Sequence, residues 1–267
     1  MTFKQRLIIR LLRYRLVAIL AEKLHVILCK CWEQTEGDIA LRLSPDLRVL
    51  AGPFAGLKFP SIEQVSLSKV LPKILGSYEE ELHPVIRSLK SNTYSTIINI
   101  GCAEGYYAVG LAMRFPQARV YAFDLNATSR EQAAYMAKMN GVQDRISFHG
   151  LFSPETIEKF QWEGPLLIVC DCEGGEYSLI TPEIWKNCTF DALIEIHDCR
   201  AATGKAAELA ARFAPTHHPQ WICGTDRHEA KYPNLSSFSS GERYRILNES
   251  RPGLMDWLWL HRLTPKA

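Results

Sequence analysis

The chain has 267 residues, of which 47% are hydrophobic and 22% are charged, a composition typical of a soluble globular protein. This length suits one large core or a domain with an appendage. Eight cysteines in a chain of this size exclude a disulfide framework, and the lack of a Cys-x-x-Cys pair argues against a structural zinc site. We therefore expect a reducing, cytoplasmic location.

The N-terminal segment is strongly basic. Positions 1–30 have a formal charge of +6, whereas the whole chain carries +2. Residues 3–33 contain neither Pro nor Gly and have helical apolar spacing, which predicts a helix. Three interpretations are open: packing on the domain or on another copy of the chain, contact with a membrane surface, and a lid over the substrate. The longest uncharged apolar run, 16–21, is too short to span a membrane, and a signal peptide is disfavoured.

Short elements follow this helix. Apolar alternation and turn residues over 38–60 predict a small antiparallel hairpin. Residues 77–90 predict a helix with Ser77 as its N-cap and the glutamates at 79–81 in its first turn. We therefore divide the chain into an N-terminal helix and β-hairpin appendage, residues 1–75, and a larger domain, residues 76–267.

Residues 96–126, TIINIGCAEGYYAVGLAMRFPQARVYAFDLN, have the pattern of a strand, a glycine-bearing turn, a helix, a second strand and an acid. Gly101 and Gly105 flank the turn, and Asp124 ends the second strand. In a site for a nucleotide-type cofactor, glycine lets the backbone approach the ligand, and a carboxylate about 20 residues later binds the ribose hydroxyls. This stretch therefore predicts such a site.

The turn departs from the dinucleotide fingerprint G-x-G-x-x-G. Tyr107 or Ala108 stands where the third glycine would be, and Glu104 would oppose a diphosphate. A ligand with a ribose and no phosphate fits better, and a nicotinamide-dependent oxidoreductase is disfavoured. The stretch resembles the first motif of class I methyltransferases that depend on S-adenosylmethionine (SAM), and this resemblance implies that Asp124 binds the cofactor ribose.

Strands alternate with helices from residue 96 onward, which predicts a parallel, doubly wound α/β sheet. The later strands are expected at 146–150, 166–170, 192–196, 220–224 and 257–261, and the later helices at 128–140, 154–160, 176–187 and 204–214. Residues 225–245 predict a loop, and the last strand follows it without an obvious long helix. This ending resembles that of class I methyltransferases, and the resemblance implies a Rossmann-like class I methyltransferase sheet with an antiparallel last strand.

Polar residues follow the fourth and fifth predicted strands, where ligands bind in an open α/β sheet. The runs IVCDCEGGEYSLI and LIEIHD resemble the paired late motifs of the FkbM-type methyltransferase family, and the likeness covers roughly residues 96–200. The family implies SAM-dependent methyl transfer, commonly to an oxygen of a small molecule or a sugar. We therefore expect a small-molecule or glycan acceptor, and no nucleic acid, because no basic patch lies near the cofactor motif.

These resemblances imply a set of site residues. The residues expected to bind SAM are Glu79, Asn99, Gly101, Ala103, Glu104, Gly105, Asp124, Leu125, Phe152 and Asp171. The expected catalytic residues are His197, Asp171 and Glu173.

Two mechanisms are open. Either His197 is a general base oriented by a carboxylate, or Asp171, Glu195 and His197 hold a magnesium or manganese ion that acidifies the acceptor hydroxyl. The alternative function is a SAM-binding regulatory or partner subunit without catalysis.

Overall fold

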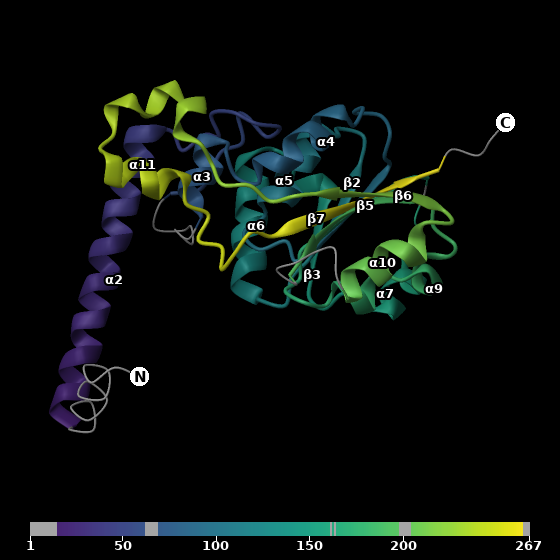
Figure 1. Cartoon of the computed structure of the whole chain (residues 1–267), viewed down its shortest axis with the longest axis horizontal. Helices are drawn as coiled ribbons and strands as arrows, with labels where there is room; N and C mark the ends of the chain where they lie inside the picture. The colour runs from purple at the N-terminus through teal and green to yellow at the C-terminus, as the bar shows by residue number, and fades with distance from the viewer. Residues whose placement is uncertain (1–14, 62–68, 161, 163, 198–203, 264–267) are drawn as a thin grey trace.

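The computed structural model describes residues 15–61, 69–160, 162, 164–197 and 204–263, and it is built around one seven-stranded sheet (Figure 1). The strand order is β3-β2-β1-β4-β5-β7-β6. The first five strands are parallel, whereas β7 pairs antiparallel with both β5 and β6. The strands are β1 (Thr96–Ile100), β2 (Arg119–Phe123), β3 (Ile146–His149), β4 (Leu166–Cys170), β5 (Phe190–Ile196), β6 (His217–Ile222) and β7 (Asp256–Arg262). The predicted α/β sheet with an antiparallel ending is confirmed.

Both faces of the sheet are covered, which explains the unbroken apolar runs of its central strands. All residues of β1 and β4 are buried. Alternate residues belong to different layers, so Ile97 packs in one apolar cluster and Ile98 in the other. The first cluster includes residues of α5 (Tyr106–Arg114) and α6 (Ala127–Met139), and the second includes residues of α9 (Pro182–Trp185) and α10 (Lys205–Phe213), on the other side of the sheet (Figure 1).

The predicted helix 176–187 is divided into two short helices. α8 (Glu176–Leu179) ends before Thr181, whose side chain accepts a hydrogen bond from the Ile184 amide at 3.4 Å. Pro182 stands in the first turn of α9, where its missing N–H is tolerated, whereas it cannot continue a preceding helix. The helix between β3 and β4, α7 (Pro154–Lys159), lies where it was predicted.

The predicted loop 225–245 is largely helical. It contains the 3-10 helices η4 (Glu229–Lys231) and η5 (Pro233–Ser237) and the helix α11 (Ser240–Leu247). Ser239 and Glu242 form a capping box at the start of α11, in which each side chain accepts a hydrogen bond from the backbone amide of the other. The loop prediction was wrong because the Ser-x-x-Glu start signal was outweighed by the many serines nearby.

The N-terminal prediction needs two corrections. α2 (Arg15–Leu43) continues through the first arm of the predicted hairpin, because Ile39, Ala40 and Leu43 are buried at helical spacing. What is left of the hairpin is a single antiparallel bridge between Arg48 and Lys58. Residues 3–14 of the predicted helix lie outside the described part of the chain.

The predicted helix 77–90 is also shorter. α3 (Val70–Leu75) ends at Gly76, the 3-10 helix η2 spans Glu80–Leu82, and α4 spans His83–Ser88. Ser77 does not cap a helix: its hydroxyl donates to the Pro72 carbonyl at 3.4 Å. The remaining short element is η3 (Gln143–Arg145).

Part of α2 is unpartnered. The side chains at positions 19–24 are all exposed, including Ile19, Leu20 and Leu24, and Figure 1 shows this end of the helix extending away from the sheet. These six positions do not pack on the domain, so contact with a membrane surface or with a second copy stays a prediction. Among the described residues, none of the helices has the length and apolar character needed to cross a membrane.

The glycine at the end of β1 provides a test of the fold. Gly101 has a φ of +79°, and a methyl group on its α-carbon would lie 1.6 Å from the Asp171 carbonyl oxygen. We expect Gly101→Ala to lower the free energy of unfolding by roughly 3 kcal/mol or more, measured by urea denaturation. Gly141→Ala is the matched control. The φ of Gly141 is +68° but no atom lies within 4 Å of the added methyl group, so this substitution should lower the free energy of unfolding only by the backbone strain that it introduces, about 1 kcal/mol. Equal losses would contradict the close approach.

Candidate active site

A cleft of about 660 Å³ opens at the carboxyl ends of β1, β2 and β4. Pockets of roughly 300–1,000 Å³ are typical of small-molecule and cofactor sites. The cleft is lined by Lys69, Lys73, Tyr78, Ile100, Gly101, Ala103, Glu104, Phe123, Asp124, Leu125, Ser129, Gln132, Gly150, Leu151, Phe152, Asp171, Cys172, Glu173, Gly175, Ser178 and Leu179. These residues come from the segment before β1, from the turns after β1, β2, β3 and β4, and from the helices α6 and α8. The cleft therefore lies where an open α/β sheet binds ligands.

The turn after β1 is held against the end of β2 by backbone hydrogen bonds. The amides of Gly101 and Cys102 donate to the Phe123 carbonyl at 2.8 and 2.9 Å. The Asp124 carboxylate then accepts one bond from the Ala103 amide and one from the Asn126 amide, both at 2.8 Å. A carboxylate offers about four acceptor positions, so Asp124 keeps acceptors for a diol in the cleft.

Strained backbone conformations gather around this cleft. Six described residues other than glycine have positive φ, and three of them, Lys69, Ala103 and Glu173, line the cleft directly. A fourth, Glu79, follows the cleft-lining Tyr78. Each such conformation costs about 1–3 kcal/mol and tends to occur at functional sites, so the clustering supports the cleft as the site.

Seven of the ten predicted cofactor residues line the cleft. They are Gly101, Ala103, Glu104, Asp124, Leu125, Phe152 and Asp171. The other three do not line it. Asn99 is buried inside β1 and donates to the Val169 carbonyl at 3.4 Å. At Gly105, an added methyl group would lie 2.9 Å from Ala133, which shows that this glycine allows α5 to pack on α6.

Glu79 is the third predicted cofactor residue outside the cleft, and it belongs to a buried ionic cluster. It is 1% exposed, accepts a hydrogen bond from Tyr107 and lies 3.2 Å from Arg251. Burial raises the pKa of Glu79, and the opposing Arg251 charge limits the rise to about 7. Sequence reasoning assigned Glu79 to a helix cap and to the cofactor, because its partner is distant in the sequence.

His197 is surrounded by four carboxyl groups beside the cleft. Its Nε2 lies 3.3 Å from Asp171, 3.4 Å from Glu173 and 3.5 Å from Glu195. Its Nδ1 lies 2.9 Å from Glu176, in a direction outside the range of a good hydrogen bond, so this contact is mainly electrostatic. The structure therefore brings together all the residues that were predicted to act on the acceptor.

The carboxylates determine the charge of His197. Burial alone would lower the pKa of its imidazole, but the contacts with Asp171 and Glu176 outweigh burial and raise this pKa to about 11. Burial and the Asp171 charge raise the pKa of Glu195 to about 10. Burial opposes ionisation of Asp171 as well, but its hydrogen bonds with His197 and Glu195 keep its pKa below the usual value. At neutral pH, His197 is thus a cation and lacks the unprotonated nitrogen that a general base needs.

One group of side chains in the described part of the chain has the geometry for a metal ion. Asp171, Glu173 and His197 each offer one ligand atom, and these atoms lie within 4.8 Å of one another. This set contains two of the three predicted ligands, with Glu173 in place of Glu195. Carboxylate oxygens with one imidazole suit magnesium or manganese.

Sequence reasoning missed the two lysines of the cleft, Lys69 and Lys73. Lys73 forms an ion pair with Glu104, and its side chain is only 8% exposed. The detectable signal was a lysine inside the apolar run VLPKIL. The Lys73 charge also offsets that of Glu104, so the argument against a diphosphate rests on the missing third glycine alone.

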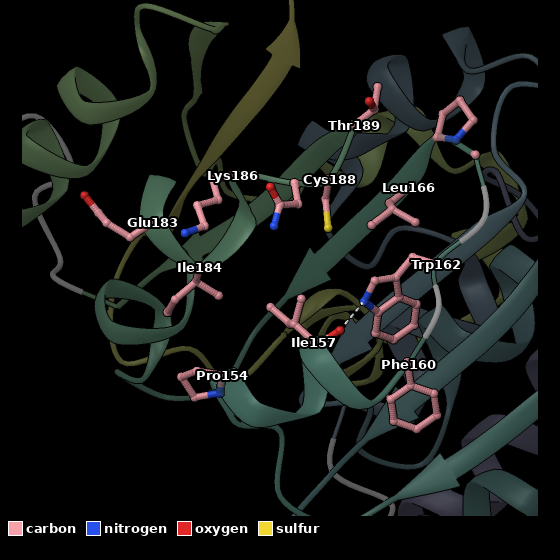
Figure 2. Close-up of a pocket in the computed structure, with 13 residues that line it drawn as sticks. Pro154, Ile157, Phe160, Trp162, Leu166, Glu183, Ile184, Lys186, Cys188 and Thr189 are labelled. Carbon is pink, nitrogen blue, oxygen red and sulfur yellow. Dashed lines mark hydrogen bonds between the residues drawn. The ribbon is translucent and has the colours of Figure 1, made fainter.

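A second cavity, of about 730 Å³, lies at the opposite edge of the sheet. It is lined by residues next to the amino ends of β4 and β5, including Leu166 and Thr189, and by side chains of α7 and α9 (Figure 2). Trp162 lies at one side of this cavity next to Phe160 and donates a hydrogen bond to the Ile157 carbonyl at 3.2 Å. None of the predicted site residues lines this cavity, so it is separate from the cleft.

The strand order, the antiparallel β7 and the glycine turn facing an acid at the end of β2 define the class I methyltransferase fold. No family model matches the chain, so the resemblance to the FkbM-type family stays a prediction. The chain is 32% identical over 99 residues to the release factor glutamine methyltransferase of a Synechocystis strain. This match covers 36% of the chain and 33% of that relative, so the chain spans about a third of its length.

Solved methyltransferase structures are similar to the chain at low identity. The O-methyltransferase TomG from Streptomyces achromogenes, involved in tomaymycin synthesis and solved with SAM, is 13% identical with a TM-score of 0.44, over 70% of this chain and 81% of that one. The precorrin-6y C5,15-methyltransferase from Geobacter metallireducens is 12% identical with a TM-score of 0.47, over 67% of this chain and 88% of that one.

The charge of His197 can be tested by NMR titration of the histidine side chains. A pKa raised to about 11 means that His197 stabilises the fold fully below about pH 6.5 and loses this contribution as the pH rises towards 11. We expect its ring signals, assigned by their loss in His197→Gln, to stay those of an imidazolium at pH 9. His83 is an internal control, because burial lowers its pKa to about 4 and keeps it neutral at pH 7. A midpoint near 6.5 for His197 would contradict the carboxylate cluster.

Proposed function

We propose that the protein is a SAM-dependent methyltransferase that transfers a methyl group to a hydroxyl of a small molecule or a glycan. The observation that carries this proposal is the position of Asp124. Its carboxylate lies 2.8 Å from the Ala103 amide of the glycine turn, at the wall of the cleft. The ion pair of Asp171 and His197 lies at the ends of β4 and β5. The partial match to a methyltransferase supports the same class of activity.

The residues of the cleft fit SAM. Asp124 has free acceptors for the ribose hydroxyls, and the largely exposed Leu125 together with the buried Phe152 offers apolar contact for an adenine ring. Phe152 is held by an edge-on contact with Phe123 at 4.9 Å between ring centroids. Residue 101 must be glycine because any side chain there would meet Asp171, and without a side chain the backbone of the turn can contact a ligand directly. When bound, SAM supplies an electrophilic methyl group on a sulfonium.

The acceptor side supplies a carboxylate. Asp171 and Glu173 line the cleft, whereas His197 lies behind them with its side chain 14% exposed. We assign Asp171 to the acceptor: its ionised carboxylate accepts a hydrogen bond from the hydroxyl and can take the proton as the oxygen attacks. The His197 imidazolium is a positioning residue that holds Asp171 ionised and oriented. Methyl transfer by in-line displacement depends on this alignment.

Binding of the cofactor is tested first by isothermal titration calorimetry. We expect wild-type protein to bind SAM and not NAD, and Asp124→Asn to weaken SAM binding by about 10–100-fold, because a charged acceptor for the ribose is lost. The exposed Asp144→Asn is the matched control and should bind as wild type does. Binding of NAD without SAM would overturn the proposed function.

Asp171 is tested by turnover, on an acceptor identified by mass spectrometry after incubation of extracts with labelled SAM. We expect Asp171→Asn to lower kcat by about 100-fold or more while SAM binds within threefold of wild type. Unchanged turnover would remove Asp171 from the mechanism. SAM binding with no turnover on any extract would favour the non-catalytic, regulatory alternative.

Chelation decides how Asp171 acts in that assay. We expect turnover to survive EDTA treatment, since the positive charge of His197 already lies 3.3 Å from Asp171 and 3.4 Å from Glu173 and can balance these carboxylates without a metal ion. A loss of turnover that magnesium or manganese restores would instead make these three side chains metal ligands.

A further inference from the structure

The ion pair of Lys73 and Glu104 joins the N-terminal part of the chain to the glycine turn. The side chains are 8% and 13% exposed, and both residues line the cleft. Lys73 belongs to α3, a helix whose residues are all buried. Its ammonium lies 4.8 Å from the ring centroid of Tyr78 and 5.4 Å from that of Tyr106, distances at which cation–π attraction holds it in place.

Stability alone explains this pair poorly. Removing an ammonium and a carboxylate from water costs several kcal/mol for each ion, and apolar residues in their place are often neutral or stabilising. A buried pair is better explained where its charges also contact a ligand. Lys73 and Glu104 are placed for such a contact, because both line the wall of the cleft.

We propose that Lys73 and Glu104 bind the amino-acid end of the cofactor, an inference that rests on the proposed function. Lys73 binds the carboxylate of the methionine moiety, and Glu104 binds its ammonium. The two ligand charges are attached to one carbon, and the ion pair presents the complementary charges side by side. Among the described residues, Glu104 is the hydrogen-bond partner of the Lys73 ammonium, which leaves two of its three donors for a ligand.

Lys69, the other lysine of the cleft, has a different place. Its charge acts on Asp171, at the acceptor side, and it stands in a left-handed conformation just before α3. Glu104 is instead adjacent to Ala103, whose amide binds Asp124 on the ribose side. Glu104 thus lies on the turn whose Ala103 amide contacts the ribose acid Asp124, as the two ends of one cofactor require.

This assignment changes the role of the N-terminal segment. Lys73 precedes residue 76, the boundary expected from the sequence, so the segment before the boundary completes the cofactor site. The cleft should therefore distinguish ligands that carry the amino-acid end from those that lack it. S-adenosylhomocysteine has both the ammonium and the carboxylate, decarboxylated SAM lacks the carboxylate, and 5′-methylthioadenosine lacks both.

The test is calorimetry of the full chain with these three ligands. We expect wild type to bind S-adenosylhomocysteine at least about 10-fold more tightly than 5′-methylthioadenosine. Lys73→Met should weaken S-adenosylhomocysteine binding by about 10–100-fold and leave the other two ligands within twofold of wild type. Glu104→Gln should weaken decarboxylated SAM as well, because that ligand keeps the ammonium. Lys90→Met, which removes an exposed charge, is the matched control and should change nothing.

The outcomes separate this inference from the proposed function. Retained binding of 5′-methylthioadenosine by Lys73→Met shows that the variant is folded and that only the amino-acid end has lost its partner. If Lys73→Met weakens the binding of all three ligands equally, Lys73 is a structural residue. If it weakens none, Lys73 is not part of the cofactor site. Either result overturns the inference but does not contradict SAM binding by the wild-type protein. Wild-type protein that binds neither SAM nor S-adenosylhomocysteine would overturn the proposed function itself.

Discussion

The close approach of the chain after β1 to the chain after β4 is the constraint on which the site depends. The Asp171 amide donates to the Ile100 carbonyl at 2.9 Å, and the Asp171 carbonyl oxygen lies where any side chain at residue 101 would be. Only glycine allows this contact together with a φ of +79°. The turn can then fold towards β2, where its Ala103 amide meets Asp124. One backbone contact thus places the cofactor side and the acceptor side next to each other.

A second constraint is the buried ionic cluster that joins the segment before β1 to the segment before β7. Arg227 lies 2.6 Å from both Glu81 and Glu249, with side chains no more than 6% exposed, and Arg251 lies 2.8 Å from Glu249. Removing one member of such a cluster leaves a buried charge without its partner, which typically costs 3–5 kcal/mol. The cluster holds Tyr78 and its neighbours in place next to the cleft, so segments far apart in the sequence together form this wall of the site.

The strands could be predicted well because their signal is local. Five parallel strands begin and end within about two residues of the prediction, since buried β-branched and apolar runs have few other places in an α/β fold. The helices were less accurate where capping decided the outcome. Thr181 and Pro182 divide one predicted helix, and Ser239 begins another inside a predicted loop. The Ile39–Leu43 stretch was predicted as a strand but is helical. The spacing of its apolar residues fits both a short strand and a helix, and only burial against the core decides between them.

The sequence by itself determined the sheet, the glycine turn and the acid that faces it, because a strand-turn-helix-strand unit brings these residues together through local geometry. It also placed Asp171 and His197 at neighbouring strand ends, since the carboxyl ends of parallel strands share one edge. Only the tertiary structure decided the charges. His197 is a cation because the carboxylates of Asp171, Glu173 and Glu176 lie within 3.4 Å of it. The charge of Glu104 is balanced by Lys73 from a separate helix. Protonation and pairing depend on burial and on charges within a few ångströms, and the residues that supply them are distant along the chain.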